Sequence, residues 1–413
     1  MSGRTMLLLA ILLGGCTSEQ AQQQLGAANP VQPWVLQNGQ QPTQWVVFPT
    51  IFQPAGIAVG PDKQIWVTAQ DTEAVYRVTV KTGRISAPAA VGFQPGPIVA
   101  GSDGNMWTCG SAGQTGGLAR ITPTLQATTY AAPGLCGGIT VGPDGAIWFT
   151  SIADCALERA TTDGVITETV SPFCPSNPHE IITGSDGNLW FTERGAGGVP
   201  VGVVRYDLGS GFTEFQTSKE VVGLALGYDG NLYGCWNPEK NAGGQLAQIS
   251  IAGSVATFSL ETKCRGSTQP TSGLRDIYYT TTSGNGARWN VHGHGDFAYG
   301  QSPSKNVSIA MAVGEDDNVW NADVFKSVEV FVNRILTVEP SAATIQVGGS
   351  QNFSVSETGC KCNWTARSSD PAVASASAVS GGVFTVTALA QGSAIITVAD
   401  SKMNTFRVSI TVQ

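Results

Sequence analysis

The sequence is poor in charged residues, helical patterns and long apolar runs. Only 13% of its 413 residues are charged, and acidic residues outnumber basic ones by 30 to 22, for a formal net charge of −8. The lack of a basic excess argues against nucleic-acid binding. Runs of Ala, Leu, Glu and Lys with the 3.6-residue spacing of a surface helix are absent. The 51 glycines instead favour many short strands joined by tight turns.

The N-terminal apolar run is too short to cross a membrane. It extends from Met6 to Leu13, whereas a membrane-spanning helix needs about 20 residues. Arg4 is the only charge that precedes it. A basic start, a short apolar stretch and small residues predict a signal peptide over residues 1–15.

The end of this signal resembles the lipobox of bacterial lipoproteins. The resemblance rests on Leu13–Cys16, which reads Leu-Gly-Gly-Cys, and it implies cleavage before Cys16 and lipidation of that cysteine. An ordinary signal peptide cut near Gly15 is the alternative. The polar residues 16–42 would then form a flexible tether. Because Thr17 rather than an aspartate follows the cysteine, we expect anchoring in the outer membrane or at the cell surface.

One octet recurs along the chain and predicts the fold. Its first copy, Val59–Trp66, reads Val-Gly-Pro-Asp-Lys-Gln-Ile-Trp, and successive terminal aromatics are 41, 41, 42, 43, 56 and 31 residues apart. The last two spacings suggest an insertion in the fifth repeat and a shortened sixth. A glycine-containing turn between apolar stretches predicts a hairpin with the aromatic on its second strand. The seven aromatics are Trp66, Trp107, Trp148, Trp190, Tyr233, Trp289 and Trp320.

Four strands in a period of roughly 40 residues are typical of a propeller blade. We therefore predict an all-β chain with a seven-bladed β-propeller over residues 43–334. The segment 43–48 fits the missing fourth strand of the last blade, so an N-terminal strand should close the ring. We interpret the repeated aromatics as core and the repeated aspartates as turn residues rather than calcium ligands.

The cysteines predict disulfides. Eight remain after Cys16 is set aside, an even number that suits an exported protein. Three follow the aromatic of their blade and three precede the next blade, so both groups should lie on the same rim. Each bond would be worth about 3 kcal/mol in the chain-entropy model. Buried free thiols are the alternative, and the state of Cys360 and Cys362 stays open. The predicted bonds are Cys109–Cys136, Cys155–Cys174 and Cys235–Cys264.

The 42-residue period stops near Ile335. The segments 340–348, 368–374 and 392–398, together with Trp364, resemble the bacterial immunoglobulin-like group 2 domain. That resemblance implies a small β-sandwich over residues 335–413. It also implies a spacer or adhesion role for this domain.

The blade sequence itself resembles a known family. Gly138–Thr150, which reads GITVGPDGAIWFT, resembles the streptogramin B lyase (virginiamycin B lyase) propellers, and the likeness extends over roughly residues 44–333. It implies linearisation of a cyclic depsipeptide antibiotic by elimination. Catalytic His and Glu residues on the rim around the channel and Mg²⁺ would supply the base and the polarising metal.

The catalytic positions of that family are mostly unmatched. Its histidines lie in a Pro-His motif before the first strand of two late blades, where this sequence has Val222, Tyr278 and Ile309. Only the fourth blade keeps the motif, as Pro178–Glu180, and the late Glu-x-His pair of the family has no counterpart. Because fold does not carry function, enzymatic activity stays open.

A different site is open to the few histidines of the chain. By the repeat pattern His179, Glu193 and His292 fall on one rim as candidates for catalysis. Together with His294 and the nearby Asp296, they are also candidates for a divalent metal site. The alternative is a set of scattered polar loop residues.

Trp236 and Asp323 are candidates for ligand contact, because they occupy rim positions where other blades have small residues. We expect a monomeric, lipid-anchored protein of the bacterial cell envelope whose propeller rim binds a small molecule, glycan or peptide without a cofactor. The alternative is a metal-dependent lyase or hydrolase of a cyclic peptide or polysaccharide, which would use Mg²⁺. A structural envelope scaffold is a third hypothesis.

Overall fold

The computed structural model describes most of the chain after residue 44. The described residues are 35–36, 45–80, 82–195, 201–236, 245–260, 264, 271–272, 276–280, 285–290, 295–301, 308–314, 318–323, 326–331, 336–357, 363–400 and 405–413. Every regular element within these ranges is a β-strand. A search of the same residues finds no helix with the length and apolarity that a bilayer crossing requires.

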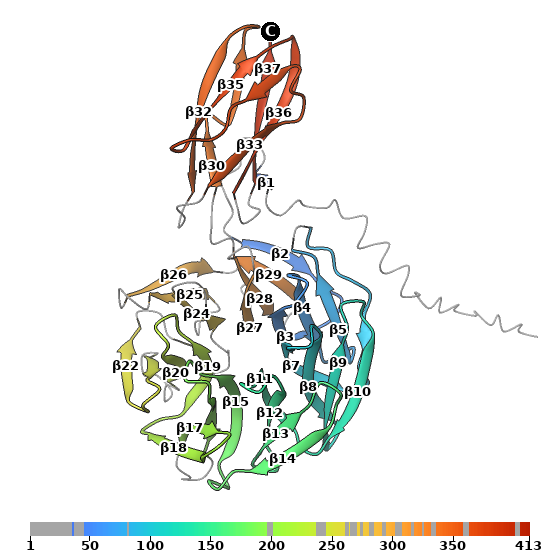
Figure 1. The fold of residues 1–413 in the computed structure, drawn as a ribbon, viewed down its shortest axis with the longest axis vertical. Coiled ribbons are helices and arrows are strands. Elements are labelled where there is room, and N and C mark those ends of the chain that lie inside the picture. The colour runs from blue at the N-terminus through green and yellow to red at the C-terminus, as the bar shows by residue number, and fades with distance from the viewer. Residues whose placement is uncertain are drawn as a thin grey trace, which may run out of the picture.

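Most described strands form four-stranded antiparallel sheets, which we number in chain order (Figure 1). Sheets 1 to 3 contain β3 Pro54–Val59, β4 Ile65–Ala69, β5 Ala74–Val78 and β6 Ala89–Ala90; β7 Gln94–Ala100, β8 Met106–Ala112, β9 Thr115–Ile121 and β10 Ala127–Ala132; and β11 Cys136–Val141, β12 Ile147–Ser151, β13 Ala156–Ala160 and β14 Ile166–Val170. Sheets 4 and 5 contain β15 Asn177–Thr183, β16 Leu189–Arg194, β17 Val201–Asp207 and β18 Gly211–Thr217; and β19 Val221–Leu226, β20 Leu232–Trp236, β21 Gln245–Ile249 and β22 Val255–Ser259. Sheet 6 contains β23 Thr271–Ser272, β24 Asp276–Thr280, β25 Asn285–Asn290 and β26 Gly295–Gln301, and sheet 7 contains β27 Ser308–Val313, β28 Val319–Asp323, β29 Ser327–Phe331 and β2 Trp45–Pro49.

The sheets are arranged around one axis. The first strands of successive sheets contact each other, and the cycle closes where β27 meets β3 (Figure 1). Strand β2 pairs with β29, so the N-terminal strand completes the last sheet, with Phe48 opposite Val328. The predicted all-β propeller closed by an N-terminal strand is therefore confirmed.

The octet builds the hairpin between the first two strands of a sheet. In sheet 1 the Asp62 carboxylate accepts a hydrogen bond from Trp66 Nε1–H at 2.9 Å and one from the Gln64 amide at 3.2 Å. A Cβ atom on Gly60 would collide with the Trp66 indole, so glycine is needed there. The repeated aspartate is thus a turn residue that also binds the fully buried ring. The same Asp-to-aromatic hydrogen bond joins Asp103 to Trp107, Asp144 to Trp148, Asp186 to Trp190 and Asp229 to Tyr233.

Sheet 6 corrects the predicted position of the sixth repeat. Trp289 lies on β25, the third strand of its sheet, and pairs with Ile277 on the second strand. The fully buried aromatic on the second strand is Tyr279. It lies 46 residues after Tyr233 and 41 before Trp320, close to the regular period. The octet ending at Trp289 therefore marks the second hairpin of the sheet, and the inferred insertion and shortened blade were wrong.

The structure contains the three predicted disulfides. Cys109–Cys136, Cys155–Cys174 and Cys235–Cys264 have Cα–Cα distances of 5.8, 5.9 and 5.8 Å. We call the end of the ring where they lie the disulfide rim. It contains the connections from second to third strands and those between successive sheets. Cys360 and Cys362 lie outside the described residues.

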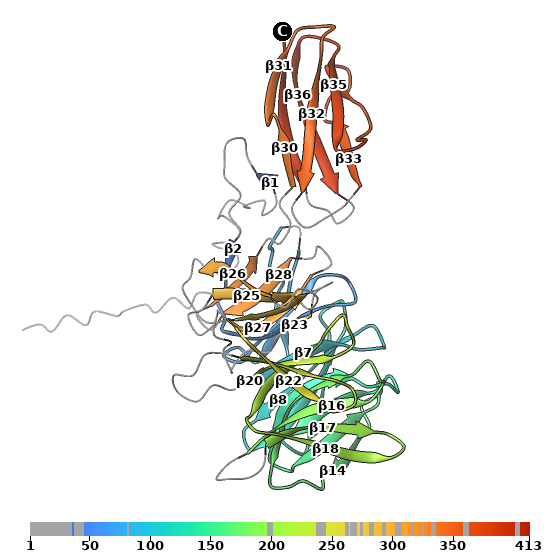
Figure 2. The ribbon, with the colours of Figure 1, turned by 90° about the vertical axis from the view of Figure 1, so that its left-hand side faces the viewer.

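A second unit follows the ring (Figure 2). One of its sheets has the order β30-β32-β35-β34; the other is β1-β37-β36-β33, with β31 also paired to β37. Apolar residues of both sheets, Phe353 and Ile396 among them, form a shared core. The predicted tether contributes β1, which pairs in parallel with β37. A two-sheet sandwich fits the predicted β-sandwich, and its immunoglobulin-like identity stays a prediction. The strands are β1 Val35–Leu36, β30 Leu336–Glu339, β31 Ala342–Ile345, β32 Ser350–Glu357, β33 Trp364–Ser368, β34 Ala374–Ala376, β35 Val383–Ala388, β36 Gly392–Asp400 and β37 Thr405–Val412.

Candidate functional site

The rim candidates from the repeat are more buried than their position suggests. Trp236 and Asp323, each at the end of a second strand, are only 6% and 1% exposed. Asp323 pairs with Ser308 and Ser327 inside sheet 7. Trp236 packs in the core between sheets 4 and 5, yet it also lines a pocket. Of the two predicted ligand contacts, Trp236 is thus the one that the described structure places at a pocket.

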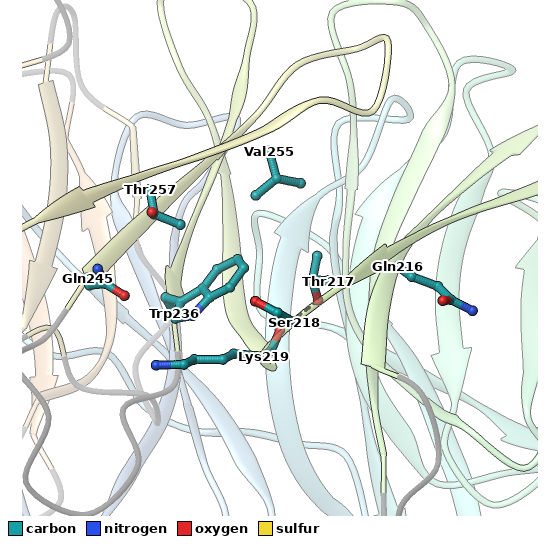
Figure 3. Close-up of a pocket in the computed structure, with 8 residues that line it drawn as sticks. All are labelled: Gln216, Thr217, Ser218, Lys219, Trp236, Gln245, Val255 and Thr257. Atoms are coloured by element: carbon teal, nitrogen blue, oxygen red, sulfur yellow. Dashed lines mark hydrogen bonds between the residues drawn. The ribbon is translucent and has the colours of Figure 1, made fainter.

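This pocket lies between sheets 4 and 5 and has a volume of about 350 Å³. Strand β18 and the connection after it form one side, and the ends of β20, β21 and β22 form the other. Figure 3 shows the Trp236 indole near the centre, with Thr257 and Ser218 beside it. The lining combines one large aromatic ring, that of Trp236, with several amide and hydroxyl side chains. The residues are Gln216, Thr217, Ser218, Lys219, Trp236, Gln245, Val255 and Thr257.

His179 lies near three charged side chains. Burial and the nearby Arg194 guanidinium lower the pKa of His179, while Glu180 and Glu220 act in the opposite direction. Arg194 binds Glu180 at 2.8 Å and Glu220 at 3.2 Å. The imidazole is therefore neutral at pH 7 and is suited to accept a hydrogen bond from a ligand.

This group does not fit the Mg²⁺ that the family resemblance implies. Magnesium needs carboxylate oxygens that are open to it, whereas Arg194 engages both Glu180 and Glu220 and the Thr192 hydroxyl donates to Glu180 at 2.6 Å. At the family's late histidine positions, Val222 and Tyr278 are buried, and a valine has no ligating atom. The group around His179 therefore does not match the Mg²⁺ site that the family resemblance implies.

Glu193 does not join His179. Glu193 lies two residues after Phe191 on β16, so the two side chains occupy the same face of the strand. Because Phe191 packs toward sheet 3, the Glu193 carboxylate lies on that side of sheet 4. Burial is the main cause that raises the pKa of Glu193 to about 7; the nearby Ser176 hydroxyl opposes the rise and Glu214 adds to it. Glu193 and His179 therefore lie in different surroundings, although both belong to sheet 4.

The remaining members of the predicted metal set belong to sheet 6. His292 and His294 lie outside the described residues, and Asp296 on β26 pairs with Trp289. As the third strand of its sheet, β25 ends at the rim opposite the disulfide rim. The prediction that His292 shares a rim with His179 assumed that Trp289 lies on a second strand, and the register of sheet 6 contradicts this assumption.

Three carboxylates that the sequence predictions did not include, Asp154, Glu158 and Glu168, lie close together at sheet 3. Glu158 pairs with Phe149, the residue that follows the blade aromatic. The equivalent residues are Tyr76, Ala119, Val204 and Ala247 in sheets 1, 2, 4 and 5, and Glu329 in sheet 7. In sheet 3 the acidic residue at this position is joined by Glu168 opposite it and Asp154 four residues before it, and this local excess of carboxylates was the signal that could have revealed the group.

The fold and rim define a β-propeller with a polar pocket between two of its sheets. Residues 38–237 match the model of the virginiamycin B lyase family. A virginiamycin B lyase of Nocardia farcinica (strain IFM 10152) is 30% identical over 121 residues, which make up 28% of this chain and 42% of that protein. The aligned region thus spans less than half of that relative.

Solved structures agree with this match. A streptogramin B lyase structure aligns with a TM-score of 0.61 at 22% identity, covering 69% of this chain and 97% of that one. A catalytically inactive virginiamycin B lyase from Staphylococcus aureus with quinupristin gives 0.59 at 22%, covering 69% and 98%. At these identities the structures show the fold alone. Together with the family match, they confirm that the propeller resembles the virginiamycin B lyase family.

Proposed function

We propose that this chain is a monomeric, lipid-anchored protein of the bacterial cell envelope whose propeller binds a glycan. The glycan occupies the pocket between sheets 4 and 5. The composition of that pocket carries the proposal. An exported protein fits the three disulfides, because such bonds persist in oxidising compartments.

The lining chemistry matches a sugar better than a metal or a cation. Amides and hydroxyls both donate and accept hydrogen bonds, as sugar hydroxyls require, and an indole offers an apolar face with a polar edge. None of the eight lining residues is acidic, and Lys219 adds a positive charge. The pocket therefore favours a neutral or anionic saccharide over a cationic peptide.

Titration of the purified full chain with two soluble probes tests the proposal. We expect chitotetraose (neutral) or tetragalacturonate (anionic) to bind in calorimetry. Gln245→Ala should weaken binding by about fivefold, since one good hydrogen bond is worth roughly 1 kcal/mol. Lys219→Ala should weaken the binding of tetragalacturonate more than that of chitotetraose. Trp236 is a poor target, because it also belongs to the core between the sheets.

Gln94→Ala is the matched control, since Gln94 is exposed at the disulfide rim on sheet 2, away from the pocket. The glycan proposal fails if neither saccharide binds, or if Gln245→Ala and Gln94→Ala bind equally well. Mg²⁺-dependent ring opening of quinupristin, detected by mass spectrometry, would replace it with the lyase alternative.

The anchor has its own test. Cys16→Ala removes the residue that the lipobox resemblance would lipidate, so the protein should move from the membrane fraction to the soluble exported fraction. Fractionation and labelling with a fatty-acid analogue measure this. Cys360→Ala is the control and should stay with the membrane. Unchanged membrane association of Cys16→Ala would contradict lipid anchoring.

A further inference from the structure

Glu158 is a buried carboxylate whose two oxygens have no hydrogen-bond partner. Its side chain is 0% exposed, and both Oε1 and Oε2 are inaccessible and unbonded. A buried carboxylate without donors costs several kcal/mol, so such groups are normally protonated, paired or bound to a metal. Glu158 lies on β13 in sheet 3, whereas the proposed glycan pocket lies between sheets 4 and 5.

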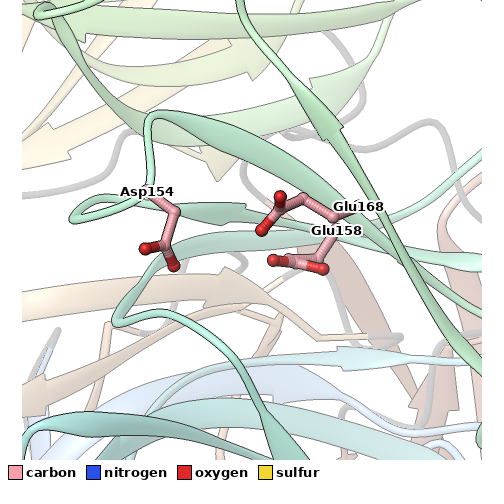
Figure 4. A group of neighbouring side chains, drawn as sticks. All are labelled: Asp154, Glu158 and Glu168. Carbon is pink, nitrogen blue, oxygen red and sulfur yellow. The ribbon is translucent and has the colours of Figure 1, made fainter.

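Two further carboxylates face the same point. Glu168 on β14 lies opposite Glu158 in the strand register, and Asp154 lies in the turn before β13. One oxygen from each of the three lies within 4.8 Å of the others. Figure 4 shows the three side chains converging from the two strands and the turn. The fully buried member therefore points toward its two exposed neighbours.

The surroundings hold this arrangement in place. The Ser151 hydroxyl donates to Asp154 Oδ2 at 2.8 Å. A Cβ atom on Gly134 would collide with Ser151 Oγ and Asp154 Oδ2, so the connection from sheet 2 passes close to this carboxylate. Cys155, the residue after Asp154, forms a disulfide with Cys174. The turn that carries Asp154 is thus fixed on both sides.

The electrostatic balance of the group is unfavourable without a cation. Glu158 is buried, and the two side chains that share its cluster, Asp154 and Glu168, are carboxylates as well. A bound cation would remove this repulsion and supply the partner that the two oxygens lack.

We propose that Asp154, Glu158 and Glu168 bind a calcium ion. Three carboxylates form a hard, all-oxygen donor set with three negative charges, which suits Ca²⁺ or Mg²⁺ rather than softer metals. Calcium accepts 6 to 8 oxygens in irregular geometry and completes its shell with water, whereas magnesium demands a near-ideal octahedron. Ligands from a turn and two strands favour calcium, which would tie the turn to the sheet.

Calorimetric titration of the purified full chain with CaCl₂ tests this site. After dialysis against a chelator, we expect one calcium per chain, with a dissociation constant of about 10⁻⁴ to 10⁻³ M, as in other extracellular modules. MgCl₂ should bind at least about tenfold more weakly. Calcium should also raise the unfolding temperature, since it binds the folded state.

Glu168→Gln is the decisive variant, because Glu168 is exposed and its loss should not impair folding. We expect it to weaken calcium binding by about tenfold or more, and Glu158→Gln to abolish binding. Glu193→Gln is the matched control: an equally buried glutamate of sheet 4 outside the cluster, it should leave binding unchanged. Absence of binding at about 10 mM calcium, equal binding by Glu168→Gln, or tighter binding of magnesium would each overturn the proposal.

Discussion

Phe48→Ala should lower the free energy of unfolding by about 3 to 5 kcal/mol, the usual range for a buried phenylalanine replaced by alanine. Phe48 lies on the closing strand β2 and is 9% exposed. Its ring stacks on Trp320 of sheet 7 with 5.7 Å between centroids. It belongs to a core cluster that also contains Ile57 and Val67 of sheet 1, so one side chain joins both ends of the ring.

Urea denaturation measures this effect, with Ile51→Ala as the control. Ile51 is three residues away but 52% exposed, so its replacement should change stability by no more than about 0.5 kcal/mol. Phe48→Ala should also expose the edge of β29 to solvent and promote aggregation. Equal stability of the two variants would contradict the role of β2 in closing the ring.

The repeat explains why the fold was predictable. Its Gly-x-Asp turn and terminal aromatic are local features, and each copy places the same hydrogen bond in the same hairpin, as between Asp186 and Trp190. The failure in sheet 6 has the same origin. Trp289 also lies in a pair of antiparallel strands, but these are the second and third strands of the sheet. A local pattern predicts a hairpin but does not determine which two strands of the sheet that hairpin joins.

The candidate site was less predictable, because it depends on how a side chain packs against the neighbouring sheet and not only on its position in the repeat. The repeat placed Trp236 and Glu193 at equivalent positions, each three residues after the blade aromatic. In the structure Trp236 reaches a pocket and Glu193 does not. The pocket is also lined by Thr217 from the neighbouring sheet, and contacts between sheets depend on packing that no single repeat encodes.

Glu193 should make the stability of the protein depend on pH. Its folded-state pKa is about 7, above the ordinary value of 4.5, so between these values the folded state keeps a proton that the unfolded state releases. Raising the pH then favours unfolding. The stabilising contribution is complete below about pH 4.5 and is lost as the pH rises through about 7. The shift corresponds to roughly 3 kcal/mol.

Glu193→Gln keeps the shape of the side chain but does not titrate, so it should be about as stable as the parent at pH 4.5 and more stable by that amount at pH 8. Urea denaturation across this range, in the presence of a chelator, measures the difference. Taking the difference cancels the titration of Glu158, which is present in both proteins.

Glu214→Gln removes a charge that raises the pKa of Glu193, so it should move the loss of stability to lower pH. Glu73 is exposed, so Glu73→Gln should change neither the stability nor its dependence on pH. A constant difference between Glu193→Gln and the parent across all pH values would show that Glu193 is not protonated in the folded protein at neutral pH.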